Sequence, residues 1–170
     1  FDSNDFLKIT DNFQKDDTIG INFDIGNALA VCEDPMTFCK KIIHKINNVH
    51  IKDYIINETK EGFLLSNCSI GKGSVDLKPI LKLINKKRPD VAKMVEPGQL
   101  KPRHIKKNKK MYWDKISSRS NYDKKMFEQS FSKGILKNTK EIKLPKKDDK
   151  EIFNFLKNQL IDSINYATKI

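Results

Sequence analysis

The stretch 19–27, Ile-Gly-Ile-Asn-Phe-Asp-Ile-Gly-Asn, is a short apolar run that stops on the carboxylate of Asp24. The pattern returns twice, as Val-His-Ile-Lys-Asp at 49–53 and as Met-Val-Glu-Pro-Gly at 94–98. Segments long enough for a helix separate the three runs, and this alternation is typical of parallel strands joined by crossover helices. The carboxyl ends of such strands meet at one edge of a sheet, where α/β proteins place their functional groups. We therefore predict an α/β fold whose three polar strand ends lie side by side.

Apolar periodicity and capping residues predict the remaining elements. Strands are predicted over 18–23, 49–52 and 91–95, with a short hairpin near 61–65 and no strand after Glu96. Helices are predicted from Ser3 or Asn4 to about 15, from Pro35 to Asn47-Asn48, from Asp76 to about 88, and from about Asp148 onward. Three strands are too few for a complete barrel or doubly wound sheet. Because the chain also begins at Phe1 without a Met, we expect a fragment of a longer protein.

Composition limits the class of protein. The chain has 170 residues, of which 38% are hydrophobic, enough for one modest core. No apolar run reaches the roughly 18 to 20 residues of a membrane span, and no signal-peptide pattern opens the chain. Cys32, Cys39 and Cys68 are odd in number and lack metal-binding spacing, which argues against a disulfide framework and a structural zinc site. Free thiols predict a reducing, cytoplasmic setting.

The net charge of +11 is unevenly distributed. Residues 1–76 carry a net charge of −4, and residues 77–170 carry +15, including a basic run at 101–110. Such a run is able to contact phosphates, but only three of the 33 basic residues are Arg. Because Lys lacks the planar fork that reads bases, and a general bias toward Lys, Asn and Ile explains the same composition, we do not expect nucleic-acid binding.

The residues that end the strands form a pattern with chemical meaning. A divalent cation prefers carboxylate oxygens and accepts an imidazole nitrogen, which Asp24, His50 and Glu96 offer together. Each residue also has a simpler explanation. Asp24 before Gly26 fits an Asx turn, and His50 fits a core histidine whose hydrogen bonds are satisfied. Glu96 is the hardest to explain otherwise, because burying an unpaired carboxylate is costly.

Four motifs in order resemble a known family. The runs 19–27 and 49–53, the turn Ile-Gly-Lys-Gly-Ser-Val-Asp at 70–76, and the strand end at 94–96 resemble the sugar phosphate isomerase/epimerase family, which has the xylose-isomerase-like TIM barrel. The resemblance covers residues 1 to about 105 and matches the last three strands of the barrel. It implies that 1–105 is the C-terminal part of a (β/α)8 barrel and that 106–170 is a Lys-rich, mostly helical extension.

The resemblance also implies a ligand set and residue roles. In the family, a divalent metal ion (Mn2+, Mg2+, Co2+ or Zn2+) is held by a Glu, an Asp, a His and a second Glu. Asp24, His50 and Glu96 match the last three, and the first Glu has no counterpart in this chain. Glu96 would also transfer protons as an acid/base group. Lys52 and Asp53 follow His50 as they do in the family and are expected near the substrate, although an exposed Lys/Asp pair explains them equally well.

Two further positions are candidates for substrate contact. Asn27 stands where many family members have His, which leaves the substrate and the reaction open. The amides of Gly71 and Gly73 precede a helix and are weak candidates for binding a phosphate. A tight turn followed by a capping Asp76 explains the same glycines, and the full phosphate-loop pattern is missing.

We predict a divalent-metal-dependent isomerase or epimerase that transfers a proton through a metal-stabilised enediolate, inactive or nearly so as a fragment. Its partner would be a small sugar, polyol or hydroxy-carbonyl compound, and the chain is compatible with a homo-oligomer. One alternative is a metal-dependent nuclease resembling endonuclease IV, which acts on abasic DNA, but its several His and Asp ligands are hard to find in a chain with three His. Another alternative is a non-catalytic barrel that serves as a binding module.

Overall fold

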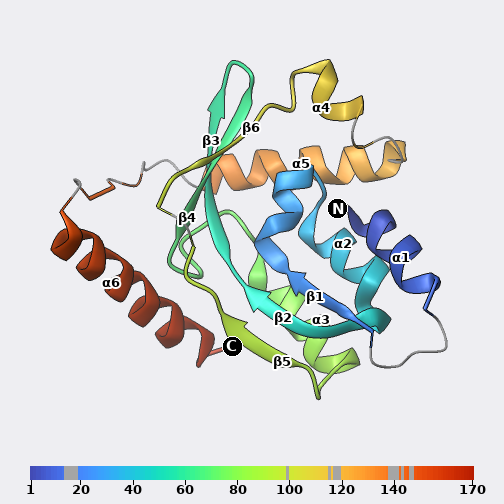
Figure 1. Ribbon diagram of the computed structural model, residues 1–170, viewed down its shortest axis with the longest axis horizontal. Coiled ribbons are helices and arrows are strands. Elements are labelled where there is room, and N and C mark those ends of the chain that lie inside the picture. Colours follow the sequence, from blue (N-terminus) through green and yellow to red (C-terminus); the bar gives the residue numbers. More distant parts are fainter. Residues whose placement is uncertain are drawn as a thin grey trace.

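In the computed structural model of the chain, residues 46–59 belong to two different sheets, and this shared segment organises the fold (Figure 1). The structure describes residues 1–13, 19–98, 100–114, 116, 120–137, 142, 144–145 and 148–170. Its strands are β1 (Ile21–Asp24), β2 (Ile46–Ile51), β3 (Asp53–Thr59), β4 (Gly62–Cys68), β5 (Ala92–Val95) and β6 (Arg103–Ile105). Its α-helices are α1 (Ser3–Asp11), α2 (Pro35–Ile42), α3 (Leu77–Lys87), α4 (Lys110–Asp114), α5 (Asn121–Lys137) and α6 (Asp149–Ala167). Two 3-10 helices, η1 (Ile25–Val31) and η2 (Ile43–Lys45), follow β1 and α2.

The first sheet is parallel and has the strand order β1-β2-β5. This confirms the predicted parallel arrangement of the three polar-ended strands within a mixed α/β fold. One face of the sheet is apolar: Phe23 is buried and stacks on Phe38 of α2, with 5.4 Å between ring centroids. The opposite face carries polar or exposed side chains such as Asn22 and Met94. The candidate residues at the strand ends are therefore on the side away from the main core.

The second sheet is antiparallel and has β4 between β3 and β6. The hairpin of β3 and β4 is longer than the short hairpin predicted near 61–65. The prediction of no strand after Glu96 was wrong, because β6 pairs with β4. Arg103–Ile105 is short and lies within a basic run, so its own sequence gives little strand signal. Ile105 opposite the buried Phe63 stabilises β6, and both side chains are in the core.

The helices largely begin where their capping residues predict. Asp34 caps α2 by accepting a hydrogen bond from the amide of Thr37, and Pro35 follows at the first helical position. The predicted end of this helix was wrong: α2 ends at Ile42, and Asn47 and Asn48 already belong to β2. The buried positions Ile46 and Val49 explain the difference. Burying these two side chains in a strand is more favourable than extending the helix as far as Asn47.

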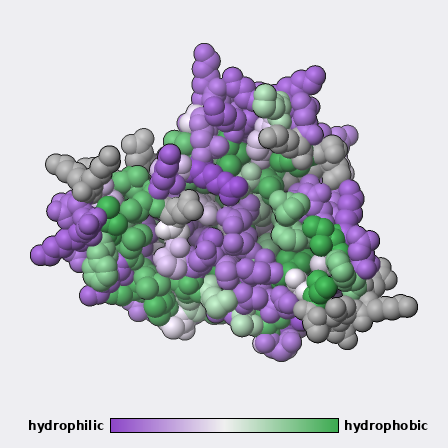
Figure 2. Space-filling view, viewed as in Figure 1, coloured by the Kyte–Doolittle hydropathy of each residue, from purple (hydrophilic) through white to green (hydrophobic). Residues whose placement is uncertain are grey.

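Residues after 105 contribute to the same core as those before it. Phe127 and Phe131 of α5 pack around Phe63, with ring centroids 6.2 Å and 4.8 Å from it. The C-terminal helix α6 lies beside β5. Its buried Ser163 also accepts a hydrogen bond from the amide of Ile70, in the loop after β4. Hydrophobic residues gather over α6 in Figure 2, and hydrophilic residues extend across the centre of the same face. Among the described residues, no helix is both long enough and apolar enough to cross a membrane.

Candidate functional site

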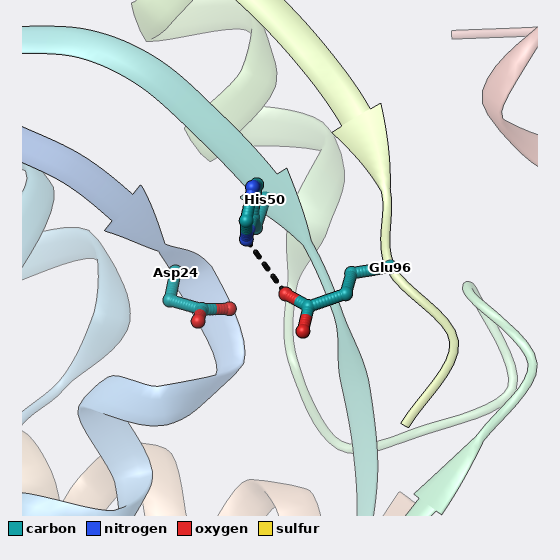
Figure 3. A group of neighbouring side chains, drawn as sticks. All are labelled: Asp24, His50 and Glu96. Atoms are coloured by element: carbon teal, nitrogen blue, oxygen red, sulfur yellow. Dashed lines mark ion pairs between the residues drawn. The ribbon is translucent and has the colours of Figure 1, made fainter. Parts of the chain in front are cut away.

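Asp24, His50 and Glu96 converge at the carboxyl end of the parallel sheet (Figure 3). Asp24 ends β1 and lies opposite His50 of β2 in the register of the sheet. Glu96 follows β5 directly, and its amide donates a hydrogen bond to the carbonyl of Ile51 at 3.3 Å. One ligand-type atom from each of the three side chains lies within 4.8 Å of the others. The structure thus brings together the three residues that the sequence analysis selected.

Lys52 lies between the two carboxylates of this group. Its ammonium nitrogen is 3.2 Å from Asp24 Oδ2 and 2.8 Å from Glu96 Oε2. Glu96 Oε2 is also 2.7 Å from His50 Nδ1. A lysine and an imidazole therefore face two carboxylates, and Lys52 already compensates part of their negative charge. The exposed Lys/Asp surface pair considered from sequence is not formed: Lys52 is only 8% exposed and pairs with Asp24 and Glu96.

Burial and ion pairing together set the pKa values of Asp24 and Lys52. Burial raises the pKa of Asp24 above its ordinary value, and the ammonium of Lys52 only partly opposes this. Burial would lower the pKa of Lys52, but its contacts with Glu96 and Asp24 outweigh burial, and its pKa is raised. Lys52 therefore stays an ammonium near neutral pH and acts as a fixed positive charge and hydrogen-bond donor, not as a base.

Asp24 has one oxygen whose hydrogen-bonding capacity is unused. Oδ2 accepts a hydrogen bond from Asn27 Nδ2 at 2.8 Å and contacts Lys52, whereas Oδ1 is buried and has no hydrogen-bond partner among the described residues. A buried, unpartnered carboxylate oxygen is costly and rare in folded proteins. This oxygen lies beside an imidazole and a second carboxylate, so it is available as a ligand for a cation.

Asn27 of η1 and Tyr54 of β3 support the position of Asp24. The hydroxyl of Tyr54 donates to Asn27 Oδ1 at 3.0 Å, while Asn27 donates to Asp24. Gly26 makes this contact possible, because a Cβ at that position would lie 2.7 Å from the Tyr54 ring. A chain of hydrogen bonds therefore fixes the carboxylate of Asp24 from the tyrosine on β3.

A cavity of about 260 Å³ lies next to Glu96, one of the three ligand-type side chains. Its lining includes Asn27, Lys52, Tyr54, Glu96, Lys101 and Arg103. A second cavity of about 240 Å³ includes Asp24 and shares Asn27 and Arg103 with the first. Asn27 and Lys52, which were predicted from sequence to bind substrate, thus line a cavity. Their role in substrate binding stays a prediction.

Asp53 does not lie in this cavity, and its predicted role as a substrate-binding residue was wrong. Its side chain is fully buried and accepts hydrogen bonds from four backbone amides. The donors are the amides of Tyr54, Gly71, Gly73 and Val75, at 2.8 to 3.1 Å. Burial raises the pKa of Asp53 to about 6, although the four amides act in the opposite direction. Asp53 is a structural group that closes the loop after β4 onto the start of β3.

The same contacts contradict a phosphate site at Gly71 and Gly73. Both amides already donate to Asp53, and its negative charge would repel a phosphate. A Cβ at Gly73 would lie 2.1 Å from Asp53 Oδ1, so the glycine allows the close approach of the carboxylate. Asp76 holds the N-cap position of α3 without a side-chain cap hydrogen bond. The turn is therefore organised by Asp53, which the sequence analysis did not foresee.

The residues at the cluster fit a divalent cation. Two carboxylates and one imidazole match the donors that such ions bind in proteins, and Asp24 Oδ1 has an unused acceptor position. Three protein ligands would leave coordination positions for a substrate, as in catalytic metal sites. Lys52 must give up part of its contact with Asp24 and Glu96 for a cation to bind, because its ammonium and the cation would compete for the same two carboxylates.

Among the cavity residues that sequence reasoning missed are a tyrosine and two cationic side chains. Tyr54, Lys101 and Arg103 come from the second sheet or from the segment that leads into it. For Tyr54 a signal was present, since the strand-forming residues Tyr-Ile-Ile follow Asp53 directly. Lys101 and Arg103 lie in a basic run, where nothing distinguishes a cavity residue from a solvated one.

Comparisons with models of protein families, with curated proteins and with solved structures found no match for this chain. The resemblance to the isomerase family therefore stays a prediction from the sequence, and the geometry of the residues themselves has to carry any functional argument.

Proposed function

We propose that this chain carries part of the active site of a divalent-metal-dependent isomerase or epimerase acting on a small sugar, polyol or hydroxy-carbonyl compound. The observation that supports it best is the convergence of Asp24, His50 and Glu96 within 4.8 Å beside a cavity. The parallel order β1-β2-β5 is compatible with three neighbouring strands of a larger α/β barrel. In this proposal, the sheet corresponds to the last three strands of that barrel.

Each residue has a distinct task in the proposed reaction. A bound divalent ion would polarise the carbonyl group of the substrate and stabilise the negative charge that develops on its oxygen. Glu96 lines the cavity and is 37% exposed, so its carboxylate is able to reach a substrate there and accept the proton from the carbon next to the carbonyl. Lys52 supplies a positive charge 2.8 Å from Glu96, and Asn27 offers polar contacts to hydroxyl groups.

Metal binding is the first test. We expect calorimetry on the chain to give one bound Mn2+ per molecule, with at least tenfold weaker binding for both His50→Ala and Glu96→Gln. Matched controls are His44→Ala and Glu58→Gln, which change the same residue types at exposed positions outside the cluster. The controls should bind Mn2+ as the wild type does. A folded chain that binds no Mn2+, or that loses binding equally in the controls, would contradict the proposal.

Proton transfer is the second test, and it does not require a complete reaction. A single carboxylate that removes and returns a proton exchanges it with solvent, so the metal-loaded chain in D2O should place deuterium on the carbon next to the carbonyl of a ketose or hydroxyketone. Nuclear magnetic resonance follows this exchange directly. Glu96→Gln should reduce the exchange to the background rate, and Glu58→Gln should not. Exchange that survives in Glu96→Gln would remove Glu96 from the role of acid/base.

The nuclease alternative receives less support from the geometry. A cluster for several metal ions needs more His and carboxylate ligands than three, and among the described residues Asp24, His50 and Glu96 form the one group with suitable spacing. His44 lies in η2, and His104 on β6 is 2.9 Å from the hydroxyl of Thr59, so neither of them joins the cluster. The alternative of a non-catalytic binding module predicts a folded chain without deuterium exchange.

A further inference from the structure

The cavity that Glu96 lines also carries positive charge for which the structure shows no ion pair among the described residues. Lys101 and Arg103 line the cavity, and neither forms an ion pair within the part of the chain that the structure describes. Both residues are exposed, whereas Lys52 at the cluster is buried and engaged by Asp24 and Glu96. The cavity lining therefore combines one lysine that two carboxylates neutralise with two exposed cations.

The second sheet holds Arg103 in this place. Arg103 of β6 is opposite Leu65 of β4, and Tyr54 of β3 is opposite Asn67 of β4. Residues directly opposite each other in an antiparallel pair project from the same face, and all four side chains line the cavity. The strand register thus determines that Arg103 projects from the face of the sheet that borders the cavity.

Arg103 also lies at the junction of the two cavities. It lines the cavity next to Glu96 and the cavity next to Asp24, and Asn27 is the other residue that they share. A ligand in either cavity would therefore meet the guanidinium. Because the planar guanidinium matches the oxygens of phosphate and carboxylate groups, it favours an anion over a neutral group.

We propose that Lys101 and Arg103 form a subsite for the anionic group, a phosphate or a carboxylate, of a small substrate whose other end lies at Asp24, His50 and Glu96. The part about the other end rests on the proposed function; the anion subsite itself does not. The two cations at the cavity wall then select charged substrates over neutral sugars of the same size. Phosphate is expected to bind more tightly than carboxylate because its second negative charge meets the second cation.

Three small probes that differ in one group test the subsite: glycerol, glycerate and glycerol 3-phosphate. Each is titrated by nuclear magnetic resonance into the metal-free chain at constant ionic strength. We expect glycerol 3-phosphate to bind most tightly, glycerate more weakly and glycerol not measurably. Arg103→Gln should weaken glycerol 3-phosphate binding about tenfold, and Lys101→Gln should weaken it severalfold. Arg103→Lys should lie between wild type and Arg103→Gln, because it keeps the charge and loses the fork.

The control for general attraction to a chain of net charge +11 is Lys86→Gln, which removes one exposed positive charge on α3. It should leave probe binding unchanged. The proposal is overturned if neither anion binds better than glycerol, or if Lys86→Gln weakens binding as much as Arg103→Gln does. The test also separates the two proposals. A chain that binds Mn2+ but no anion overturns the subsite alone, and one that binds glycerol 3-phosphate but no Mn2+ overturns the proposed metal site alone.

Discussion

Two aspartates, Asp53 and Asp24, show how differently the two sheets use the same side chain. Asp53, at the start of the antiparallel sheet, accepts four backbone hydrogen bonds. Asp24, at the end of the parallel sheet, keeps one buried oxygen without a hydrogen-bond partner among the described residues. A carboxylate that is fully hydrogen-bonded stabilises its surroundings, whereas one with an unused oxygen costs free energy that a ligand is able to recover. The difference separates a structural aspartate from a candidate ligand without any appeal to sequence position.

The substitution Asp53→Asn should have the largest effect. An amide in place of the carboxylate presents a donor to amides that are themselves donors, in a site with no access to water. We expect the free energy of unfolding to fall by about 3 kcal/mol or more, measured by urea denaturation. The control Asp90→Asn, at an exposed position, should change it by less than about 0.5 kcal/mol. A loss as small as that in the control would mean that the four hydrogen bonds matter little.

The pH dependence of Asp53 gives a second, smaller signal. Burial raises its pKa from the ordinary 3.8 to about 6, so the folded chain holds this proton more tightly than the unfolded chain does. The contribution of Asp53 to stability should therefore be greatest below pH 4, decrease as the pH rises to about 6, and stay constant above that. The carboxyl carbon of Asp53 should titrate with a midpoint near pH 6 in nuclear magnetic resonance. A midpoint below pH 4 would mean that the four amides outweigh burial.

Asp24→Asn should separate stability from metal binding. Because burial raises the pKa of Asp24, removing its charge should change the free energy of unfolding of the metal-free chain by less than about 1 kcal/mol. Mn2+ at about 100 times its dissociation constant should stabilise the wild type by about 2.7 kcal/mol and the variant by much less. Urea denaturation with and without Mn2+ measures both effects. A variant that Mn2+ stabilises as strongly as the wild type would remove Asp24 from the site.

The smallest effect is expected at a third aspartate, Asp162 of α6, which forms an exposed ion pair with Lys72. Lys72 lowers the pKa of Asp162 through this contact, but both side chains are largely in solvent. Lys72→Ala should change the free energy of unfolding by less than about 0.5 kcal/mol, and the difference should shrink at high salt. A loss comparable to that of Asp53→Asn would mean that this pair anchors α6.

Local sequence signals predicted the elements whose formation depends on neighbouring residues. The starts of α2 and α6 follow from Asp34 and Asp148, because a capping side chain acts within three residues of its own position. The parallel strands follow from their apolar runs. The elements that depend on distant partners were predicted less well. The strand β6 was missed, because it forms by pairing with β4. The helix α2 ends earlier than predicted, because Asn47 and Asn48 belong to β2.

By itself, the sequence determined that Asp24, His50 and Glu96 lie at or next to the ends of three strands, because short apolar runs and helix-length gaps specify parallel strands whose ends meet. The tertiary structure decided the rest. It turned Asp53 away from the cavity onto four amides, placed Lys52 between two carboxylates, and brought Arg103 to the cavity through the pairing of β6 with β4. The physical reason is distance along the chain. Strand and cap signals act over a few residues, whereas ion pairs, burial and edge pairing depend on residues that only the fold brings together.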